Sequence, residues 1–134
     1  SLMHDKKIIA THGAPKAIGP YSQGVVSNGH IFLSGQIPLN SNGELLDGNI
    51  QEQVALVFQN IQHLLETQNC TLQNIVKLTV FLKDIENFDA VNDKMIELLE
   101  EPYPARSLVQ AAALPKNVDI EIEVIAGLNK HGER

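Results

Sequence analysis

The apolar residues between positions 50 and 65 recur at the spacing of one face of an α-helix. They are Ile50, Val54, Val57, Phe58, Ile61, Leu64 and Leu65. The opposite face carries glutamines and glutamates, so the segment has one apolar side and one polar side. Such a helix cannot bury its apolar side alone. It must pack against a sheet or another helix, and this requirement constrains the fold more than any other feature of the chain.

Short segments rich in β-branched residues surround this helix and predict six strands. The expected strands cover residues 7–11, 22–27, 30–36, 75–83, 105–113 and 119–126. Asn28-Gly29 lies between the second and third strands. This dipeptide is typical of a type I′ hairpin turn, because both central residues of that turn need a positive φ.

A second amphipathic helix is expected over residues 88–99. Its inward residues are expected to be Phe88, Val91, Met95, Leu98 and Leu99. The element order β-β-β-α-β-α-β-β predicts an α+β fold, in which both helices pack on one face of a single sheet. The other face of the sheet then needs a cover. Other subunits are the expected cover in a chain of this size, so we expect a homo-oligomer.

The length of 134 residues suits one domain with a substantial core, and we treat residues 1–134 as that domain. Ser1 and Leu2 precede Met3 and are interpreted as a cloning remnant. Aromatic residues make up only 4% of the chain against 43% for all hydrophobic residues, so the expected core is aliphatic.

Charge and cysteine content narrow the class of function. The formal net charge of −6 and the short basic run Lys6-Lys7 argue against binding to nucleic acid, which depends on cationic side chains that neutralise phosphates. No apolar stretch approaches the length of a membrane span. The single cysteine, Cys70, excludes an internal disulfide and favours a cytoplasmic location. We expect Cys70 to be a packing residue.

Common cofactor and metal signatures are missing from the sequence. There is no phosphate-binding glycine loop, no GxSxG and no HExxH motif. The histidines stand at positions 4, 12, 30, 63 and 131, without the spacing of metal ligands. We therefore expect no metal and no cofactor, and we interpret His63 as a surface residue of the first helix.

Arg106 is the only arginine before the final residue, and it opens the apolar run of residues 107–114. A guanidinium at the start of a strand that leads into a core needs a fixed anionic partner. That partner is either an Asp or Glu of the protein or the carboxylate of a small substrate. Considered alone, the residue favours the protein salt bridge.

Four further segments have unusual local chemistry. Residues 19–24 read GPYSQG and present Tyr21 on a fixed turn, and residues 34–38 read SGQIP and place Gly35 at a strand end. Residues 104–107 read PARS. In the last strand Glu121 and Glu123 share one face, by default a solvated one, although one carboxylate there could transfer protons if the face lines a pocket.

In this order the segments resemble the RidA/YjgF family of reactive-intermediate deaminases. The resemblance runs from about residue 14 to residue 126. Besides the segments above, it rests on Gln53 and Asn60-Ile61 in the first helix, on VKLTVFLKDIENF at 76–88, on Val91-Asn92, and on LP followed by IEIEVIA within 114–126. Five ordered motifs with similar spacing make it specific.

The resemblance implies a chorismate-mutase-like fold and a homotrimer whose three pockets lie between subunits. It also implies hydrolysis of 2-enamine and 2-imine acids, such as 2-aminoacrylate and 2-aminocrotonate, to 2-keto acids and ammonia. The family reaction uses neither a cofactor nor a metal. A substrate with a carboxylate reverses the interpretation of Arg106, which then binds the substrate in place of a protein side chain.

The resemblance also assigns roles to individual residues. Arg106 would bind the substrate carboxylate, Tyr21 would close the pocket, and Glu121 would orient a water or carry its proton. The expected substrate-binding residues are Arg106, Ser34, Gly35, Asn92 and Leu108. Of these, Gly35 and Leu108 would act through their backbone.

Two positions depart from the family pattern. Leu108 replaces a frequent cysteine, which excludes thiol chemistry there, and Met95 replaces a frequent aromatic residue. Two other functions stay open at this point. One is a non-catalytic trimer that binds small carboxylates or regulates other proteins. The other is a ribonuclease or translation inhibitor, against which the acidic charge counts.

Overall fold

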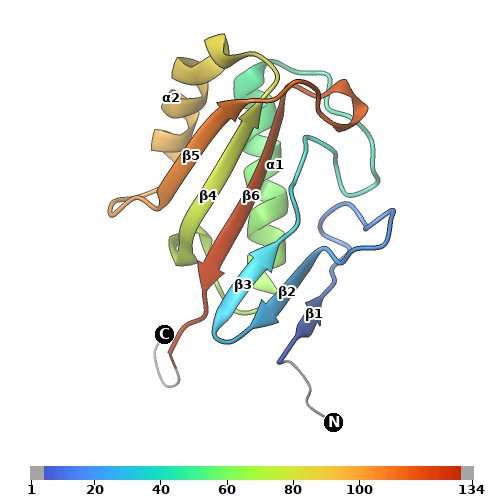
Figure 1. Ribbon diagram of the computed structural model, residues 1–134, viewed down its shortest axis with the longest axis vertical. Coiled ribbons are helices and arrows are strands. Elements are labelled where there is room, and N and C mark those ends of the chain that lie inside the picture. The colour runs from blue at the N-terminus through green and yellow to red at the C-terminus, as the bar shows by residue number, and fades with distance from the viewer. Residues whose placement is uncertain (1–4, 131–134) are drawn as a thin grey trace.

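The computed structural model describes residues 5–130, which form one mixed six-stranded sheet with two helices on the same side of it (Figure 1). The strands are β1 (Lys7–Ile9), β2 (Gly24–Ser27), β3 (His30–Leu33), β4 (Ile75–Leu82), β5 (Ala105–Gln110) and β6 (Ile120–Gly127). The helices are α1 (Ile50–Glu66) and α2 (Phe88–Leu98). The expected α+β fold and element order are confirmed, and the strands are shorter than or equal in length to the predicted ones.

The strand order across the sheet is β1-β2-β3-β6-β4-β5. Every neighbouring pair is antiparallel except β4 and β5, which are parallel and joined through α2. A parallel pair needs a crossover of this kind, because its two strands start at the same end of the sheet. The strand that begins with Ala105 and Arg106 is therefore an edge strand, with Val109 largely exposed. This differs from the buried position that the apolar run of residues 107–114 suggested.

The β2–β3 turn has the predicted type I′ geometry. Asn28 and Gly29 have φ values of 55° and 81°, and Ser27 pairs with His30 on either side of them. Gly tolerates this conformation freely and Asn better than most residues, which explains the use of Asn-Gly here.

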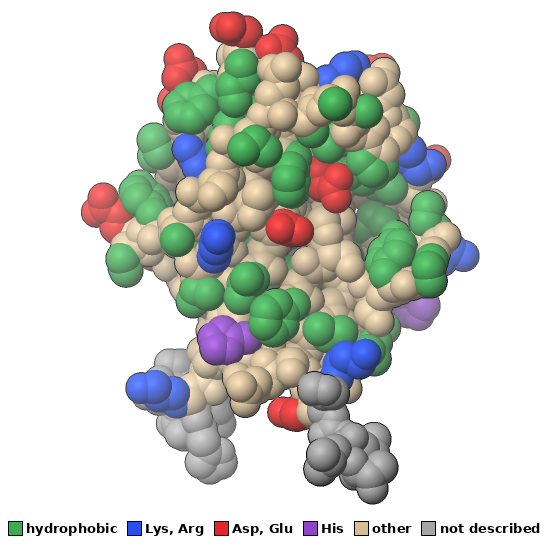
Figure 2. All heavy atoms as spheres, viewed as in Figure 1, with side chains coloured by type: hydrophobic (Ala, Val, Ile, Leu, Met, Phe, Trp, Pro, Cys, Tyr) green, Lys and Arg blue, Asp and Glu red, His purple; other side chains and the backbone are tan. Residues whose placement is uncertain are grey.

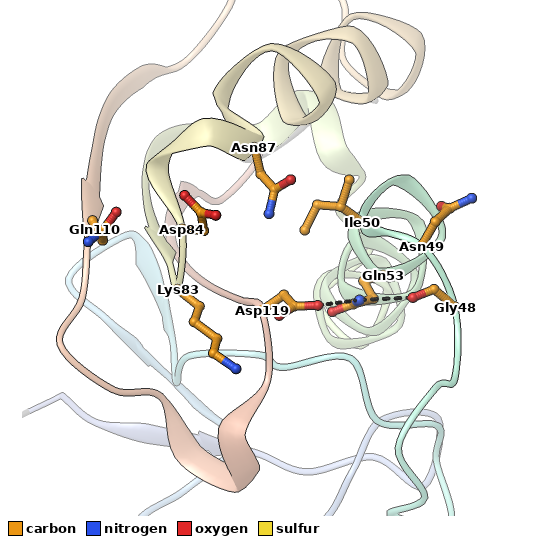
Figure 3. Close-up of a pocket in the computed structure, with 9 residues that line it drawn as sticks. All are labelled: Gly48, Asn49, Ile50, Gln53, Lys83, Asp84, Asn87, Gln110 and Asp119. Atoms are coloured by element: carbon orange, nitrogen blue, oxygen red, sulfur yellow. Dashed lines mark hydrogen bonds between the residues drawn. The ribbon is translucent and has the colours of Figure 1, made fainter.

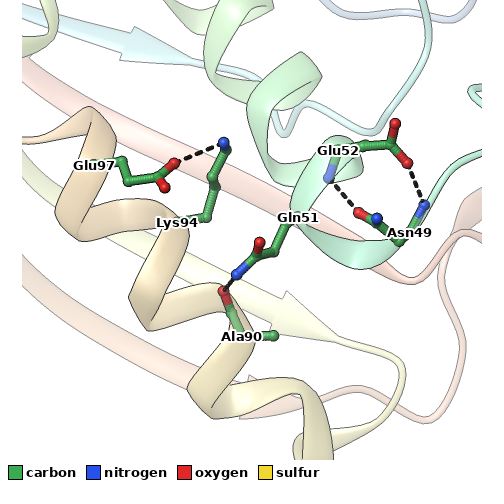
Figure 4. Close-up of polar contacts among 6 residues, drawn as sticks. All are labelled: Asn49, Gln51, Glu52, Ala90, Lys94 and Glu97. Atoms are coloured by element: carbon green, nitrogen blue, oxygen red, sulfur yellow. Dashed lines mark hydrogen bonds and ion pairs between the residues drawn. The ribbon is translucent and has the colours of Figure 1, made fainter.

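A capping box fixes the start of α1. The Asn49 Oδ1 atom accepts a hydrogen bond from the Glu52 backbone N at 2.8 Å, and the Asn49 backbone N donates to Glu52 Oε1 at 2.9 Å (Figure 4). Such reciprocal bonds satisfy backbone donors that a helix start leaves unpaired. Gln51 Nε2 also donates to the Ala90 carbonyl at 3.2 Å, which ties α1 to α2. The two helices are therefore placed relative to each other as well as to the sheet.

The aliphatic core lies between the sheet and the helices. It contains the predicted face of α1, in which only Ile50 is half-buried, together with the nearly inaccessible Ile120, Ile122 and Val124 of β6. Cys70 is buried in this core, as expected of a packing residue. In β4, Val76 is exposed because the register between β4 and β6 shifts between Ile75 and Lys77.

The prediction that Phe88 faces the core is wrong. Phe88 is 40% exposed and is the first residue of α2. The other four predicted inward residues are buried or half-buried.

Within residues 5–130 no helix covers the second face of the sheet, which is the face toward the viewer in Figures 1 and 2. Apolar side chains are spread across this open face, with acidic side chains near its middle (Figure 2). Ile8, Phe32 and Val109 are among its exposed large apolar residues. Neither helix of the described chain has the length and hydropathy of a bilayer crossing.

Candidate functional site

The Arg106 side chain lies on the helix side of the sheet. Its neighbours across the strands are Leu78 and then Val124, both buried in the core. Arg106 Nη1 donates to Asn92 Oδ1 at 2.5 Å and lies 3.7 Å from Met95 Sδ. The guanidinium carbon is 5.5 Å from the centre of the Phe88 ring, within the range of a cation–π contact. Three residues of α2 therefore hold the guanidinium.

Arg106 has no acidic partner within residues 5–130, where the ion pair Lys94–Glu97 is the only one. The protein salt bridge that the residue alone suggested is not present in that part of the chain. Arg106 borders a largely apolar cavity of about 280 Å³, which we call the arginine pocket; its wall includes Leu78, Met95, Ile96, Leu99 and Tyr103. A half-buried guanidinium next to an apolar wall suits a small acid with an apolar body.

Glu121 lies on the open face, against Gly35. The segment that contains Gly35 runs beside β6, where Gln36 and Ile122 exchange two backbone hydrogen bonds of 2.8 and 3.0 Å. A Cβ atom at position 35 would collide with the Glu121 carboxylate. Burial, and secondly the nearby Glu123 carboxylate, raise the pKa of Glu121 above its ordinary value. A carboxyl group in this condition can exchange a proton closer to neutral pH than a solvated one.

Tyr21, Ser34, Gly35 and Glu121 all line one cavity of about 670 Å³, which we call the glutamate pocket. Ser34 Oγ donates to the Ser22 carbonyl at 2.6 Å, which joins the two motif loops. Tyr21 is 51% exposed, and its hydroxyl accepts a hydrogen bond from the Ile18 backbone N at 3.4 Å. Tyr21 therefore stands at the rim of the pocket and is free to cover a ligand.

Gln23 was not among the predicted site residues, although it belongs to the GPYSQG motif. Its side chain is 6% exposed and accepts from the Thr11 backbone N at 2.7 Å. Its amide nitrogen lies within 3.3 Å of the carbonyls of Thr11, Ala14 and Pro15. Gln23 thereby fixes the loop that forms one wall of the glutamate pocket. The sequence offered one sign of this role, because Gln23 is a polar residue within the predicted strand 22–27.

The predicted site residues fall into two groups that lie on opposite sides of the sheet. Arg106 points to the helix side. Glu121 pairs with Phe81 of β4, which in turn pairs with Val109 of β5. All three side chains face the open side of the sheet. Asn92 and the half-buried Leu108 belong with Arg106 on the helix side. Tyr21, Ser34 and Gly35 belong with Glu121.

A third, polar cavity of about 510 Å³ contains none of the predicted residues (Figure 3). It lies where α1 begins and β6 starts. Gln53 Nε2 there donates to Asp119 Oδ2 at 2.9 Å and to the Gly48 carbonyl at 3.0 Å. These bonds anchor the start of α1 to the start of β6, so we interpret the contacts as structural.

Residues 5–130 contain no group of three or more His, Cys, Asp or Glu side chains placed to hold a metal ion. His63 is half-buried, and its Nδ1 atom lies 2.6 Å from the Gly13 carbonyl, so it links α1 to the loop before β2. It is therefore more than the surface residue we expected. His4 and His131 lie outside the described residues.

The family described as Endoribonuclease L-PSP matches residues 11–128, and the chain belongs to this family, which is the RidA/YjgF family of the resemblance. A relative from Lactococcus lactis, named "Putative regulator AldR", is 49% identical over 121 residues, covering 90% of this chain and 96% of that protein. The human 2-iminobutanoate/2-iminopropanoate deaminase is 41% identical over 122 residues, covering 90% and 89%. The crystal structure of E. coli TdcF with bound serine is 40% identical, with a TM-score of 0.84 and coverage of 92% and 99%.

Gly35→Ala is expected to lower deaminase activity by about tenfold or more, because the new methyl group displaces the Glu121 carboxylate. The folded state should tolerate the change, since the displaced atoms end a flexible, half-buried side chain. The measurement is kcat/KM together with the thermal midpoint of unfolding. Gly127→Ala is the matched control, because its Cβ meets only Val76 Cγ1 at an ordinary 3.9 Å. Wild-type activity in Gly35→Ala would contradict the placement of Glu121 in the site.

Proposed function

We propose that this protein is a hydrolytic deaminase that converts reactive 2-enamine and 2-imine acids, such as 2-aminoacrylate and 2-aminocrotonate, to 2-keto acids and ammonia. The observation that carries the proposal is a half-buried guanidinium that α2 holds in place and that has no acidic partner within residues 5–130. The human relative bears the name of this activity. The serine in the TdcF structure supports the proposal, because serine is also a small 2-amino carboxylate.

The residues suit the chemistry as follows. Arg106 binds the substrate carboxylate and thereby fixes the position of C2. A water attacks C2 of the imine, so that a C–O bond forms and the nitrogen takes up a proton. Glu121 accepts the proton of the water and returns it to the nitrogen. The hydroxyl proton then passes to the nitrogen as well, the C–N bond breaks, and ammonia leaves with the keto acid as the other product. All atoms come from the substrate and one water.

We propose further that the active unit is a homotrimer and that each site uses two chains. Arg106, Asn92 and Leu108 would come from one chain and Tyr21, Ser34, Gly35 and Glu121 from its neighbour. The opposite orientation of Arg106 and Glu121 supports this arrangement. The uncovered apolar side chains of the open face support an assembly, because monomers rarely leave such a face in water. The buried free thiol of Cys70 fits the expected cytoplasmic location.

The experiment that tests the function couples a serine dehydratase to this protein and follows pyruvate release. The proposal predicts release faster than the spontaneous hydrolysis of 2-aminoacrylate. The Lactococcus relative is named a putative regulator, which favours a regulator as the one other candidate. Such a regulator would bind a small carboxylate at the pocket of Arg106. A regulator would bind 2-ketobutyrate in calorimetry but leave pyruvate release at the spontaneous rate.

A further inference from the structure

The structure assigns Phe88, Asn92 and Met95 the role of positioning residues, which orient the Arg106 guanidinium so that its Nε and Nη2 edge faces the ligand. The inference rests on the proposed function for the identity of the ligand, a small 2-imino or 2-keto carboxylate. It goes beyond that function in naming the edge of the guanidinium that binds and the residues that select it.

The three residues share one face of α2. Their separations of four and three positions place them one above another along a helix, and this face lies beside β5. Each contacts the guanidinium differently, through an aromatic ring, an amide oxygen and a thioether sulfur. One helix therefore supports the guanidinium on its flat face, through the Phe88 ring, and at Nη1, through Asn92 and Met95.

Counting donors identifies the free edge. A guanidinium has five N–H groups, two on each Nη and one on Nε. Nη1 is engaged by Asn92 Oδ1 and Met95 Sδ. Nη2 and Nε have no hydrogen-bond partner within residues 5–130. These two nitrogens form one side of the planar group and match the two oxygens of a carboxylate.

The contact with the Arg106 guanidinium explains why Phe88 occupies a partly exposed position. A cation over an aromatic face is attracted to it, and the flat ring also limits the rotation of the guanidinium. Side-chain freedom that is already lost before binding is not lost again when the ligand arrives. An exposed phenylalanine at the start of α2 thus improves carboxylate binding without contacting the ligand.

The neutral charge of the Asn92 amide is essential if Arg106 is to be oriented and still bind a carboxylate. An acceptor oxygen directs Nη1, but an amide carries no net charge and leaves the positive charge of Arg106 available. An aspartate of the same shape would form an internal ion pair and compete with the ligand. The chemistry therefore requires an uncharged acceptor at position 92.

The first test is Asn92→Asp, with Asn87→Asp as the matched control. The control makes the same change of charge on the residue before α2, whose side chain makes no capping hydrogen bond and which is not among the residues that contact Arg106. Binding of 2-ketobutyrate is measured by calorimetry. We expect Asn92→Asp to weaken it by about tenfold or more, and Asn87→Asp to change it by less than about threefold. Equal effects in the two variants would overturn the inference, and circular dichroism checks that both are folded.

The second test is Phe88→Leu against Phe88→Tyr. Loss of the ring face should raise KM by about threefold to tenfold with a smaller change in kcat, and tyrosine should restore the wild-type KM. A parallel titration with 2-ketobutyramide, which lacks the carboxylate, should show no difference between the variants. A KM that is unchanged in Phe88→Leu, or not restored by tyrosine, would contradict the positioning role.

These outcomes remain separate from the proposed function. If the protein binds 2-ketobutyrate but releases no pyruvate above the spontaneous rate, the deaminase proposal fails, while the first test, which measures binding alone, still decides the orientation of Arg106. The opposite case is that Arg106→Ala abolishes activity, while Asn92→Asp binds 2-ketobutyrate as Asn87→Asp does and Phe88→Leu has the KM of Phe88→Tyr. The proposed function then stands and the inference fails.

Discussion

Arg106→Ala is expected to lower kcat/KM for 2-aminoacrylate by about 10²- to 10⁴-fold. The variant loses two charge-assisted hydrogen bonds to the substrate carboxylate, each worth about 1.5–3 kcal/mol. The loss should also appear as weaker binding of 2-ketobutyrate, because both acids use the same group. The measurements are steady-state kinetics in the coupled assay and calorimetry of the keto acid.

Arg106→Lys should recover only part of the loss, since an ammonium cannot present two parallel donors to a carboxylate. Lys94→Ala is the control for removal of a cation from the same region, because its only ion pair is with Glu97 on the surface of α2. This control should retain wild-type kinetics. Wild-type activity in Arg106→Ala, with the assembly intact, would contradict the assignment of Arg106 as the carboxylate-binding group.

Glu121→Gln is expected to lower kcat by about 10²- to 10⁴-fold, which is the usual contribution of a positioned acid or base. In the wild type, the base form must be ionised. Burial and Glu123 raise the pKa of Glu121, so the acid limb of the pH–rate profile should lie above that of an ordinary glutamate. Glu123→Gln removes the second cause and should move this limb to lower pH with activity retained. An unchanged limb in Glu123→Gln would contradict the assignment of the limb to Glu121.

The ionised form of Glu121, which the reaction needs, should lower the stability of the folded protein. Because the pKa of Glu121 is higher in the folded than in the unfolded chain, its favourable contribution is present at pH below the unfolded pKa and is lost as pH rises through the folded pKa. At neutral pH the wild type therefore contains an unfavourable buried charge. Glu121→Gln should be at least as stable there as the wild type in thermal unfolding, although nearly inactive. A clear loss of stability would show that the carboxylate is favourably paired.

The sequence contains most of the information about the fold, and particular patterns explain why. The helical period of residues 50–65 and the capping pair Asn49 and Glu52 define α1 locally, and Asn28-Gly29 defines the hairpin. The place of a strand within the sheet cannot be inferred from the residues of that strand alone. Residues 107–114 are apolar in sequence, yet β5 is an edge strand, because strand order depends on which partners the whole chain offers. Phe88 has the helical period of a core residue, but it is the first residue of α2 and its partly exposed ring lies beside the Arg106 guanidinium.

The site residues could be named from motifs, but their grouping could not. Alternation within β6 indicates that Glu121 and Ile122 face opposite sides, and it says nothing about where Arg106 of β5 points. Only the register with Leu78 places Arg106 on the helix side. The contact of the Asn92 amide oxygen with the guanidinium was not predicted, and its binding to substrate stays a prediction. Gln23 escaped notice because its four backbone partners are known only once the loop is folded.

Mixed assemblies of Arg106→Ala and Glu121→Gln chains test the two-chain site most directly. Each variant alone leaves one essential group out of every site. If Arg106 and Glu121 of one site come from different chains, random mixing in equal amounts leaves about a quarter of the sites with both groups. The two variants, unfolded together and refolded, should then regain about a quarter of the wild-type activity, and mixing without subunit exchange should regain none. Mixed assemblies that are verified by native mass spectrometry and remain inactive would contradict the account.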